Sequence, residues 1–133
     1  MKAIGFTHSL GIDETQSLFE FDVPDPVANG RDLLVDVKAV SVNPADAKRR
    51  IRTAVDTPHE APLVLGYDAV GVVAAVGSDV TNFAVGDEVW YAGDPTRSGS
   101  NAQRQLVDER VVGRKPKNLS WAEAAAMPLT GLT

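Results

Sequence analysis

The stretch that decides the fold is residues 65–77, which read LGYDAVGVVAAVG and are followed at 86–89 by GDEV. Valine and alanine dominate this stretch, and Gly66, Gly71 and Gly77 interrupt it. Glycine weakens a strand interior and usually marks a bulge or the close approach of another backbone. The spacing therefore predicts a buried strand over 70–76 that passes through a confined place. The Gly-Asp turn predicts a new strand near residue 88.

The composition indicates an ordinary globular domain. The chain has 133 residues, of which 44% are hydrophobic and 23% are charged, enough for one domain with a core. A net charge of -5 disfavours general nucleic-acid binding. The chain has no cysteine, which excludes disulfides, thiolate catalysis and cysteine-ligated zinc within it. Because neither a membrane-spanning apolar run nor a signal-peptide core is found, we expect no membrane partner and a cytoplasmic location.

The rest of the chain is typical of short strands joined by turns, with two short helices. Asn43 precedes Pro44, which predicts a helix to about residue 51. Ser120 and Glu123 form a capping-box pattern that predicts a helix over 121–127, which Pro128 should end or kink. Strands are expected at 2–6, 18–23, 33–42, 70–76, 88–92 and within 102–112. The fold class is therefore mainly β with short helices, arranged as a small irregular β-barrel.

The glycine pattern resembles the N-terminal, GroES-like domain of the medium-chain dehydrogenase/reductase superfamily. Further landmarks of the resemblance fall at 101–107, 115–116, 119–120, 123–125 and 128–133. The resemblance implies a GroES-like barrel over residues 1–127, with 128–133 as the start of the connection to a dinucleotide-binding Rossmann domain. No Gly-x-Gly-x-x-Gly occurs in the chain, so we expect that domain to lie outside these residues.

Tyr67 and Asp68 carry the functional part of the resemblance. In the family this place usually reads Gly-His-Glu, and the histidine binds catalytic zinc. Tyrosine is a poor zinc ligand, so the resemblance implies the zinc-free branch that is similar to quinone oxidoreductases. There Tyr67 would line the substrate pocket, and its hydroxyl could also act as an acid. Asp68 would belong to the same pocket or lie behind it as a hydrogen-bond acceptor.

Asn43 and Thr130 each allow two interpretations. Zinc-free relatives place an asparagine like Asn43 beside the nicotinamide and the substrate, where zinc-dependent relatives have a cysteine ligand. From the residues alone, the N-cap of the Pro44 helix is the favoured role of Asn43, and the resemblance makes the cleft role equal to it. Thr130 resembles a threonine that approaches the nicotinamide carboxamide, and its alternative role is a helix N-cap. Asp46 is expected to be a structural acid in the first helical turn.

Two further groups of residues are expected to carry no chemistry. A basic cluster follows Asp46 and should form a solvated face of the short helix; it consists of Lys48, Arg49, Arg50 and Arg52. His8 and His59 have no acidic or histidine neighbours at ligand spacing, so the sequence predicts no metal site.

The resemblance implies that the intact protein transfers hydride from NADPH to a quinone or an α,β-unsaturated carbonyl. Without a metal, the substrate must already be electrophilic, and the cofactor carries the chemistry. The 133 residues alone should be inactive and should form a homodimer or otherwise self-associate through uncovered apolar surface. Two alternatives remain at this point. One is a non-catalytic GroES-like binding or structural module. The other is a zinc-dependent alcohol dehydrogenase, which the missing cysteines and Tyr67 oppose.

Overall fold

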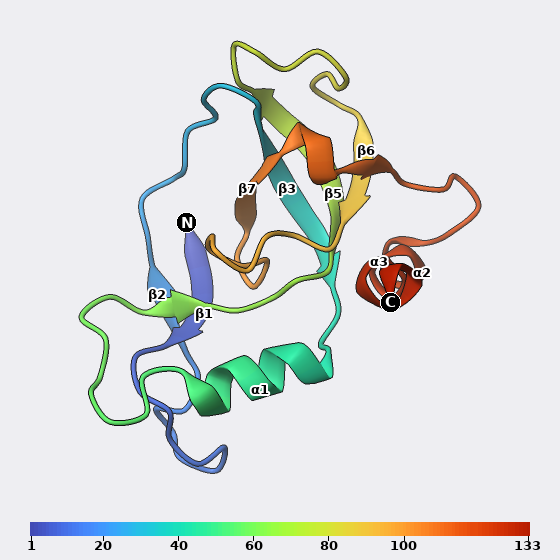
Figure 1. The fold of residues 1–133 in the computed structure, drawn as a ribbon. Helices are drawn as coiled ribbons and strands as arrows, with labels where there is room; N and C mark the ends of the chain where they lie inside the picture. The colour runs from blue at the N-terminus through green and yellow to red at the C-terminus, as the bar shows by residue number, and fades with distance from the viewer.

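The computed structural model describes residues 1–133, and its strands form two antiparallel sheets (Figure 1). The smaller sheet has the order β2-β1-β4, with β1 at Lys2–Phe6, β2 at Phe19–Asp22 and β4 at Leu63–Val64. The larger sheet has the order β7-β3-β5-β6-β8. Its strands are β3 (Asp32–Val40), β5 (Ala69–Val76), β6 (Glu88–Tyr91), β7 (Arg104–Asp108) and β8 (Gly113–Arg114). The predicted fold class, mainly β with short helices, is confirmed.

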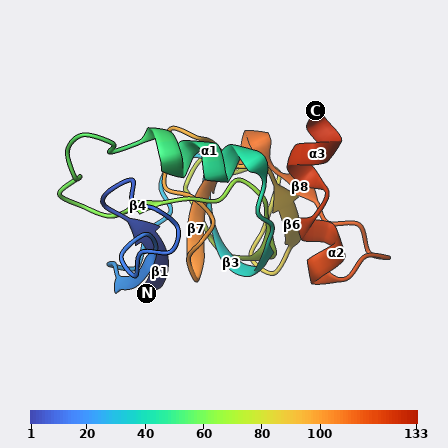
Figure 2. The same ribbon diagram turned by 90° about the horizontal axis from the view of Figure 1, so that it is seen from below.

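Three short α-helices and one 3-10 turn lie beside the two sheets. They are α1 (Pro44–Arg52), the 3-10 turn η1 (Glu109–Val111), α2 (Trp121–Ala125) and α3 (Pro128–Leu132). Figure 1 and Figure 2 both place α2 and α3 beside β6, on the opposite side of the molecule from β1 and β2. No helix is long and apolar enough to cross a membrane.

Strand β5 lies at the centre of the larger sheet and is buried on both faces. One face, with Ala69 and Val73, belongs to the main core, which also contains Leu33, Val35, Val89, Tyr91 and Val107. On the other face, Val70 packs against Ala124 and Ala125 of α2. Because successive strand residues point to opposite faces, burial on both sides explains the nearly continuous apolar run in the sequence.

The glycines of this stretch lie where the backbone leaves no room for a side chain. A Cβ atom on Gly71 would collide with the carbonyl oxygen of Asp36 on β3, beside an irregularity in the β3–β5 register. A Cβ atom on Gly77 would collide with the carbonyl oxygen of Gly30. The predicted close approach of another backbone is therefore confirmed at both positions.

The structure differs from the sequence prediction in three elements. Strands β4 and β8, of two residues each, were not predicted, because two residues carry no detectable alternation. Pro128 begins a separate helix, α3, after α2 ends at Ala125. Proline suits the first turn of a helix because its missing N–H would have no partner there. The Ser120–Glu123 capping box is present as predicted.

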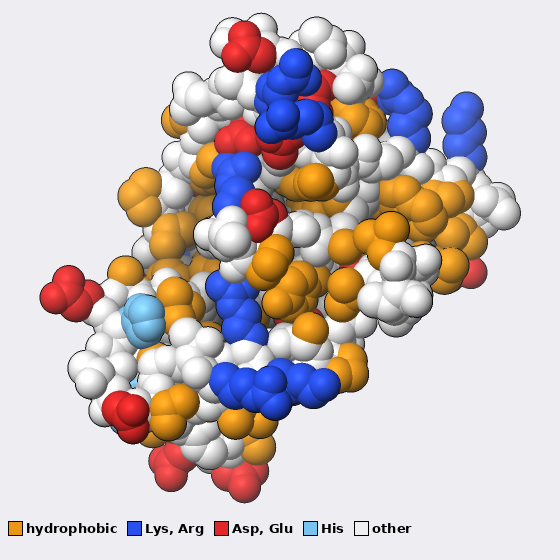
Figure 3. Space-filling view, in the orientation of Figure 1, with side chains coloured by type: hydrophobic (Ala, Val, Ile, Leu, Met, Phe, Trp, Pro, Cys, Tyr) orange, Lys and Arg blue, Asp and Glu red, His pale blue; other side chains and the backbone are white.

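The expectation of a fully solvated basic face on α1 is wrong for Arg50. Figure 3 shows basic side chains along α1, in the lower part of the view. Arg50, however, is buried and donates to the carbonyl oxygen of Leu10 at 2.6 Å. The long apolar stem of arginine allows its burial when the guanidinium finds an acceptor.

Replacing Gly71 by alanine tests the confined path of β5. We expect Gly71→Ala to lower the free energy of unfolding by about 1–3 kcal/mol, because the new methyl group meets the β3 backbone. Gly11→Ala is the matched control, since no atom lies within 4 Å of the added Cβ, and should change stability by less than about 0.5 kcal/mol. Urea unfolding measures both, and equal stabilities of the two variants would contradict the packing.

Candidate functional site

The carboxylate of Asp68, just before β5, joins three segments of the chain. Its side chain has 0% exposure. One oxygen, Oδ2, accepts hydrogen bonds from Ser41 Oγ and, at 2.9 Å, from Asn43 Nδ2. The other oxygen, Oδ1, accepts from the backbone N–H of Leu129 at 2.8 Å. Both oxygens therefore accept hydrogen bonds from uncharged donors, and these bonds replace the water that a buried carboxylate loses.

The backbone around Asp68 is held from two further sides. The carbonyl oxygen of Asp68 accepts from Ser100 Oγ at 2.9 Å. The N–H of Gly66 donates to Asp46 Oδ1 at 3.0 Å. Gly66 has a φ of +114, and a Cβ there would collide with Ser100. Hydrogen bonds to α1 and to the segment around Ser100 therefore hold residues 66–68 in place. They fix the backbone position from which the Tyr67 side chain projects.

Asn43 lies at the corner between β3 and α1. It is the N-cap residue of α1, and its side chain and that of Asp46 form a capping box at the first turn of this helix. The amide nitrogen of Asn43 donates to Asp68 and, at 3.5 Å, contacts Ser41 Oγ. The backbone N–H of Asn43 donates to Asp46 Oδ2 at 2.9 Å. Asp46 is thus a first-turn acid, as the sequence predicts, and the structure shows that it is buried. Asn43 is also buried, with 7% exposure, and is turned toward Asp68.

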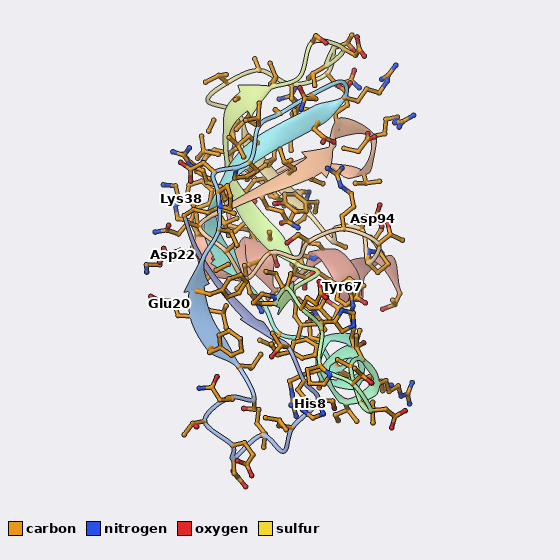
Figure 4. The ribbon with its side chains drawn as sticks, turned by 90° about the vertical axis from the view of Figure 1, so that its left-hand side faces the viewer. His8, Glu20, Asp22, Lys38, Tyr67 and Asp94 are labelled. Atoms are coloured by element: carbon orange, nitrogen blue, oxygen red, sulfur yellow. The ribbon has the colours of Figure 1, made fainter.

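Tyr67 is partly exposed, and its hydroxyl makes no hydrogen bond within the chain. Figure 4 places it between α1 and the segment that carries Asp94. Both the donor and the acceptor capacity of this phenol are therefore free for a ligand. Tyr91, a second tyrosine nearby in the sheet, differs from Tyr67 because it is buried and donates to Gln105 Oε1 at 2.8 Å. Burial raises the pKa of Tyr91 far above its ordinary value, so Tyr91 stays neutral.

Thr130 lies inside α3 and is exposed. Its hydroxyl donates to the carbonyl oxygens of Ala126 at 3.2 Å and Met127 at 3.3 Å. The alternative role as an N-cap is therefore wrong, because α3 begins two residues earlier and Met127 is its N-cap. The bond between Leu129 and Asp68 places Thr130 one residue from the polar cluster.

The structure thus brings together the four residues that the sequence singled out. Asn43 and Asp68 are in direct contact, Tyr67 adjoins Asp68 in the chain, and α3 is tied to Asp68 next to Thr130. Sequence reasoning missed Ser41, Ser100 and the N–H of Leu129. Ser41 had a usable signal, because it precedes Asn43 by two residues in an extended segment and so lies on the same side. The other two are brought close only by the fold.

The side chains that commonly bind metal ions are dispersed over this chain. No group of three or more His, Cys, Asp and Glu side chains is arranged to hold one. His8 Nε2 lies 3.2 Å from the carbonyl oxygen of Val55, away from any acid cluster. The oxygens of Asp68 are already engaged by N–H and O–H donors, which compete with any cation for the same lone pairs.

The alcohol dehydrogenase GroES-like domain matches the chain over residues 29–132, and the chain belongs to this family. Its GroES-like fold is thereby established. A zinc-type alcohol dehydrogenase-like protein of Staphylococcus epidermidis is 47% identical over 100% of the chain and 38% of its own length. A 2-methylene-furan-3-one reductase of Solanum lycopersicum is 40% identical over 97% of the chain and 34% of its own length. The chain therefore spans less than two fifths of these relatives.

Solved structures agree with this assignment. A protein from Rhizobium etli that is described as a zinc-dependent alcohol dehydrogenase is 55% identical to this chain. The match has a TM-score of 0.95 and covers 100% of this chain and 38% of that protein. The quinone oxidoreductase of Coxiella burnetii is 31% identical, with a TM-score of 0.85 over 100% of this chain and 42% of its own. A mycobacterial protein complexed with NADPH is 30% identical, with a TM-score of 0.82 over 99% of this chain and 39% of its own.

Proposed function

We propose that residues 1–133 are the substrate-side part of an NADPH-dependent, zinc-independent reductase of quinones or α,β-unsaturated carbonyls. The observation that carries the proposal is the set of groups at the site. Tyr67 offers a free phenol, Asn43 offers an amide, and Asp68 has both carboxylate oxygens occupied by hydrogen-bond donors. This set can position a ligand by hydrogen bonds, and it lacks the free thiolates, imidazoles or carboxylates that zinc requires.

The chemistry assigned to the chain follows from these groups. NADPH, when bound, would supply the hydride. Tyr67 would line the substrate pocket and donate a hydrogen bond to the substrate carbonyl, with proton transfer as a further capacity. Asn43 and the exposed α3, which carries Thr130, would face the cofactor. Asp68, which has no exposed surface, would act from behind the pocket by holding Asn43 and α3 in place.

The relatives support this reading in part. An enone reductase, a quinone oxidoreductase and an NADPH complex are all among the similar proteins. Two relatives of 47% and 55% identity carry zinc in their names, which favours zinc-dependent alcohol dehydrogenase as the second candidate function. Residues 1–127 would form the GroES-like domain, and 128–133, mostly α3, would begin the connection to the nucleotide-binding domain. The cytoplasmic location remains a prediction from the sequence.

Steady-state kinetics on the full-length protein test the proposed reaction. We expect NADPH oxidation that depends on a 1,4-benzoquinone or on an enone. Residues 1–133 alone should show neither this activity nor tight NADPH binding by calorimetry, because a dinucleotide needs a phosphate-binding site. Oxidation of simple alcohols, with no reduction of either acceptor, would show that the second candidate function is correct.

Metal analysis tests the independence from zinc. The full-length protein, purified without an affinity tag and dialysed against a chelator, should hold less than a stoichiometric amount of zinc at this site and keep its reductase activity. To separate this site from zinc bound elsewhere in the protein, the same analysis is made on residues 1–133. About one zinc per 133-residue chain after dialysis would refute the proposal.

The role of Tyr67 is tested by removing its hydroxyl alone. If Tyr67 is a pocket wall that donates one hydrogen bond, Tyr67→Phe should lower kcat/KM by about 10-fold, the value of one hydrogen bond. Tyr91→Phe serves as the matched control, because its hydroxyl is buried in the sheet and faces Gln105. A loss of several orders of magnitude in Tyr67→Phe alone would identify Tyr67 as the proton donor.

We also propose that the 133-residue chain by itself associates with a second copy. A groove of about 660 Å³ runs between α3 and the strands β6 and β8, with Trp90, Val112, Met127 and Leu132 among its lining residues. Figure 3 shows hydrophobic side chains gathered on this side of the molecule, and Leu132 is 79% exposed. Exposed apolar patches of this kind promote association.

Light scattering across a dilution series measures this association. We expect residues 1–133 to form a dimer or larger species that dissociates on dilution, and Leu132→Lys to shift the equilibrium toward monomer. Val27→Lys, at a site that is 70% exposed and outside the groove, is the control. A monomer at high concentration that binds no apolar dye would contradict the proposal.

A further inference from the structure

Asn29 and Gly30 form the only Asn-Gly pair of the chain, in the turn that leads into β3. The carbonyl oxygen of Asn29 accepts from the N–H of Asp32 at 3.0 Å, which closes a β-turn. Asn29 is exposed, and its amide nitrogen makes a single hydrogen bond, of 3.3 Å, to the carbonyl oxygen of Val27. The side-chain amide of Asn29 is therefore in contact with water and weakly held.

The backbone nitrogen of Gly30 is open to reaction with this amide. Its N–H donates to no group of the chain, so no hydrogen bond must break before the nitrogen reacts. Gly30 has a φ of +56, which glycine adopts without strain, and it has no Cβ to shield the nitrogen. Attack by this nitrogen on the side-chain carbonyl carbon of Asn29 closes a cyclic imide, a succinimide.

We propose that Asn29 is a site of spontaneous deamidation, with isoaspartate among its products. The nitrogen of Gly30 loses its proton and bonds to the side-chain carbonyl carbon of Asn29, and the amide nitrogen takes up a proton and leaves as ammonia. Water then opens the imide. Opening at the backbone carbonyl leaves the main chain running through the side chain, as isoaspartate, and opening at the side-chain carbonyl gives aspartate. The net reaction consumes one water and releases one ammonia, without oxidation or reduction.

The turn that would change holds two other segments in place. The carbonyl oxygen of Gly30 accepts from the N–H of Asp79 at 2.9 Å, and an added Cβ on Gly77 would collide with the peptide bond before Gly30. Next in the chain, Arg31 donates to the buried carboxylate of Glu109 at 3.2 Å. An aspartate has the shape of asparagine and fits this arrangement. Isoaspartate adds a methylene group to the main chain and displaces the peptide from both contacts.

The turn and the candidate site lie at opposite ends of β3. The strand has nine residues, Asp32–Val40, which span about 30 Å. Figure 1 shows β3 running from the top of the molecule down toward α1. A displaced turn should therefore lower the stability of the protein and leave Tyr67 and Asp68 in position.

Peptide mapping of the full-length protein, aged at mildly alkaline pH, tests the site. Trypsin cuts after Lys2 and Arg31 and releases a peptide in which Asn29 is the only asparagine. Asn118 is the matched internal control, because it is also exposed and the side chain of Leu119 shields the nitrogen that follows it. We expect Asn29 to lose its amide at least about 10-fold faster than Asn118, measured by mass spectrometry. Equal rates, or an unmodified Asn29, would overturn the proposal.

The consequence for the fold is tested on the acidic species that anion exchange separates from aged wild type and that aged Asn29→Gln does not form. Freshly prepared Asn29→Asp is the matched control, because it has the same charge and a normal main chain. We expect an isoaspartyl methyltransferase to label the acidic species alone, and its thermal unfolding midpoint to lie about 2–4 °C below that of Asn29→Asp. An unlabelled species that unfolds together with Asn29→Asp would show that isoaspartate does not form, and would overturn that part of the proposal.

Discussion

The buried carboxylate of Asp68 is the interaction on which the candidate site depends. A charged group without exposure is tolerated only when hydrogen-bond donors replace water, and the three donors here come from two distant segments. Ser41 and Asn43 belong to the corner between β3 and α1, and Leu129 belongs to α3. Pulling any of these segments away would leave part of a buried charge unpaired. The carboxylate therefore links the start of β5 to the corner between β3 and α1 and to α3.

Strand β5 positions the carboxylate of Asp68, which directly precedes it. It pairs with β3 on one side and β6 on the other, and it is buried on both faces. Gly71 and Gly77 let the backbones of neighbouring segments approach the strand more closely than a side chain would permit. Because β5 is so confined, the residues just before it, Tyr67 and Asp68, have little freedom. Rigid support of this kind is what a site that works by positioning requires.

Much of this could be predicted from the sequence because it depends on local patterns. The glycines around β5, Pro44 at the start of α1 and the Ser120–Glu123 capping box each act over a few residues, and each is found as expected. What could not be predicted depends on contacts between distant segments. Arg50 is buried because Leu10 supplies an acceptor, and Asp68 reaches Leu129, 61 residues away. Neither the composition of the chain nor the spacing of its residues predicts such contacts.

Thr130 illustrates the same limit at the site itself. Its hydroxyl suggested a helix cap, yet the turn that places Leu129 on Asp68 starts α3 at Pro128 and leaves Thr130 inside the helix. The local pattern was compatible with either arrangement. In the structure Pro128 occupies the first turn of α3, and the N–H of Leu129 is held by Asp68.

The most direct test of this account is hydrogen exchange at the backbone amide of Leu129, measured by NMR on the full-length protein. The first N–H groups of a helix have no acceptor within it, and the only partner of this N–H is Asp68. The account predicts slow exchange of the Leu129 amide in wild type and fast exchange in Asp68→Ala. Exchange of the wild-type amide at the rate of an unstructured chain would contradict it.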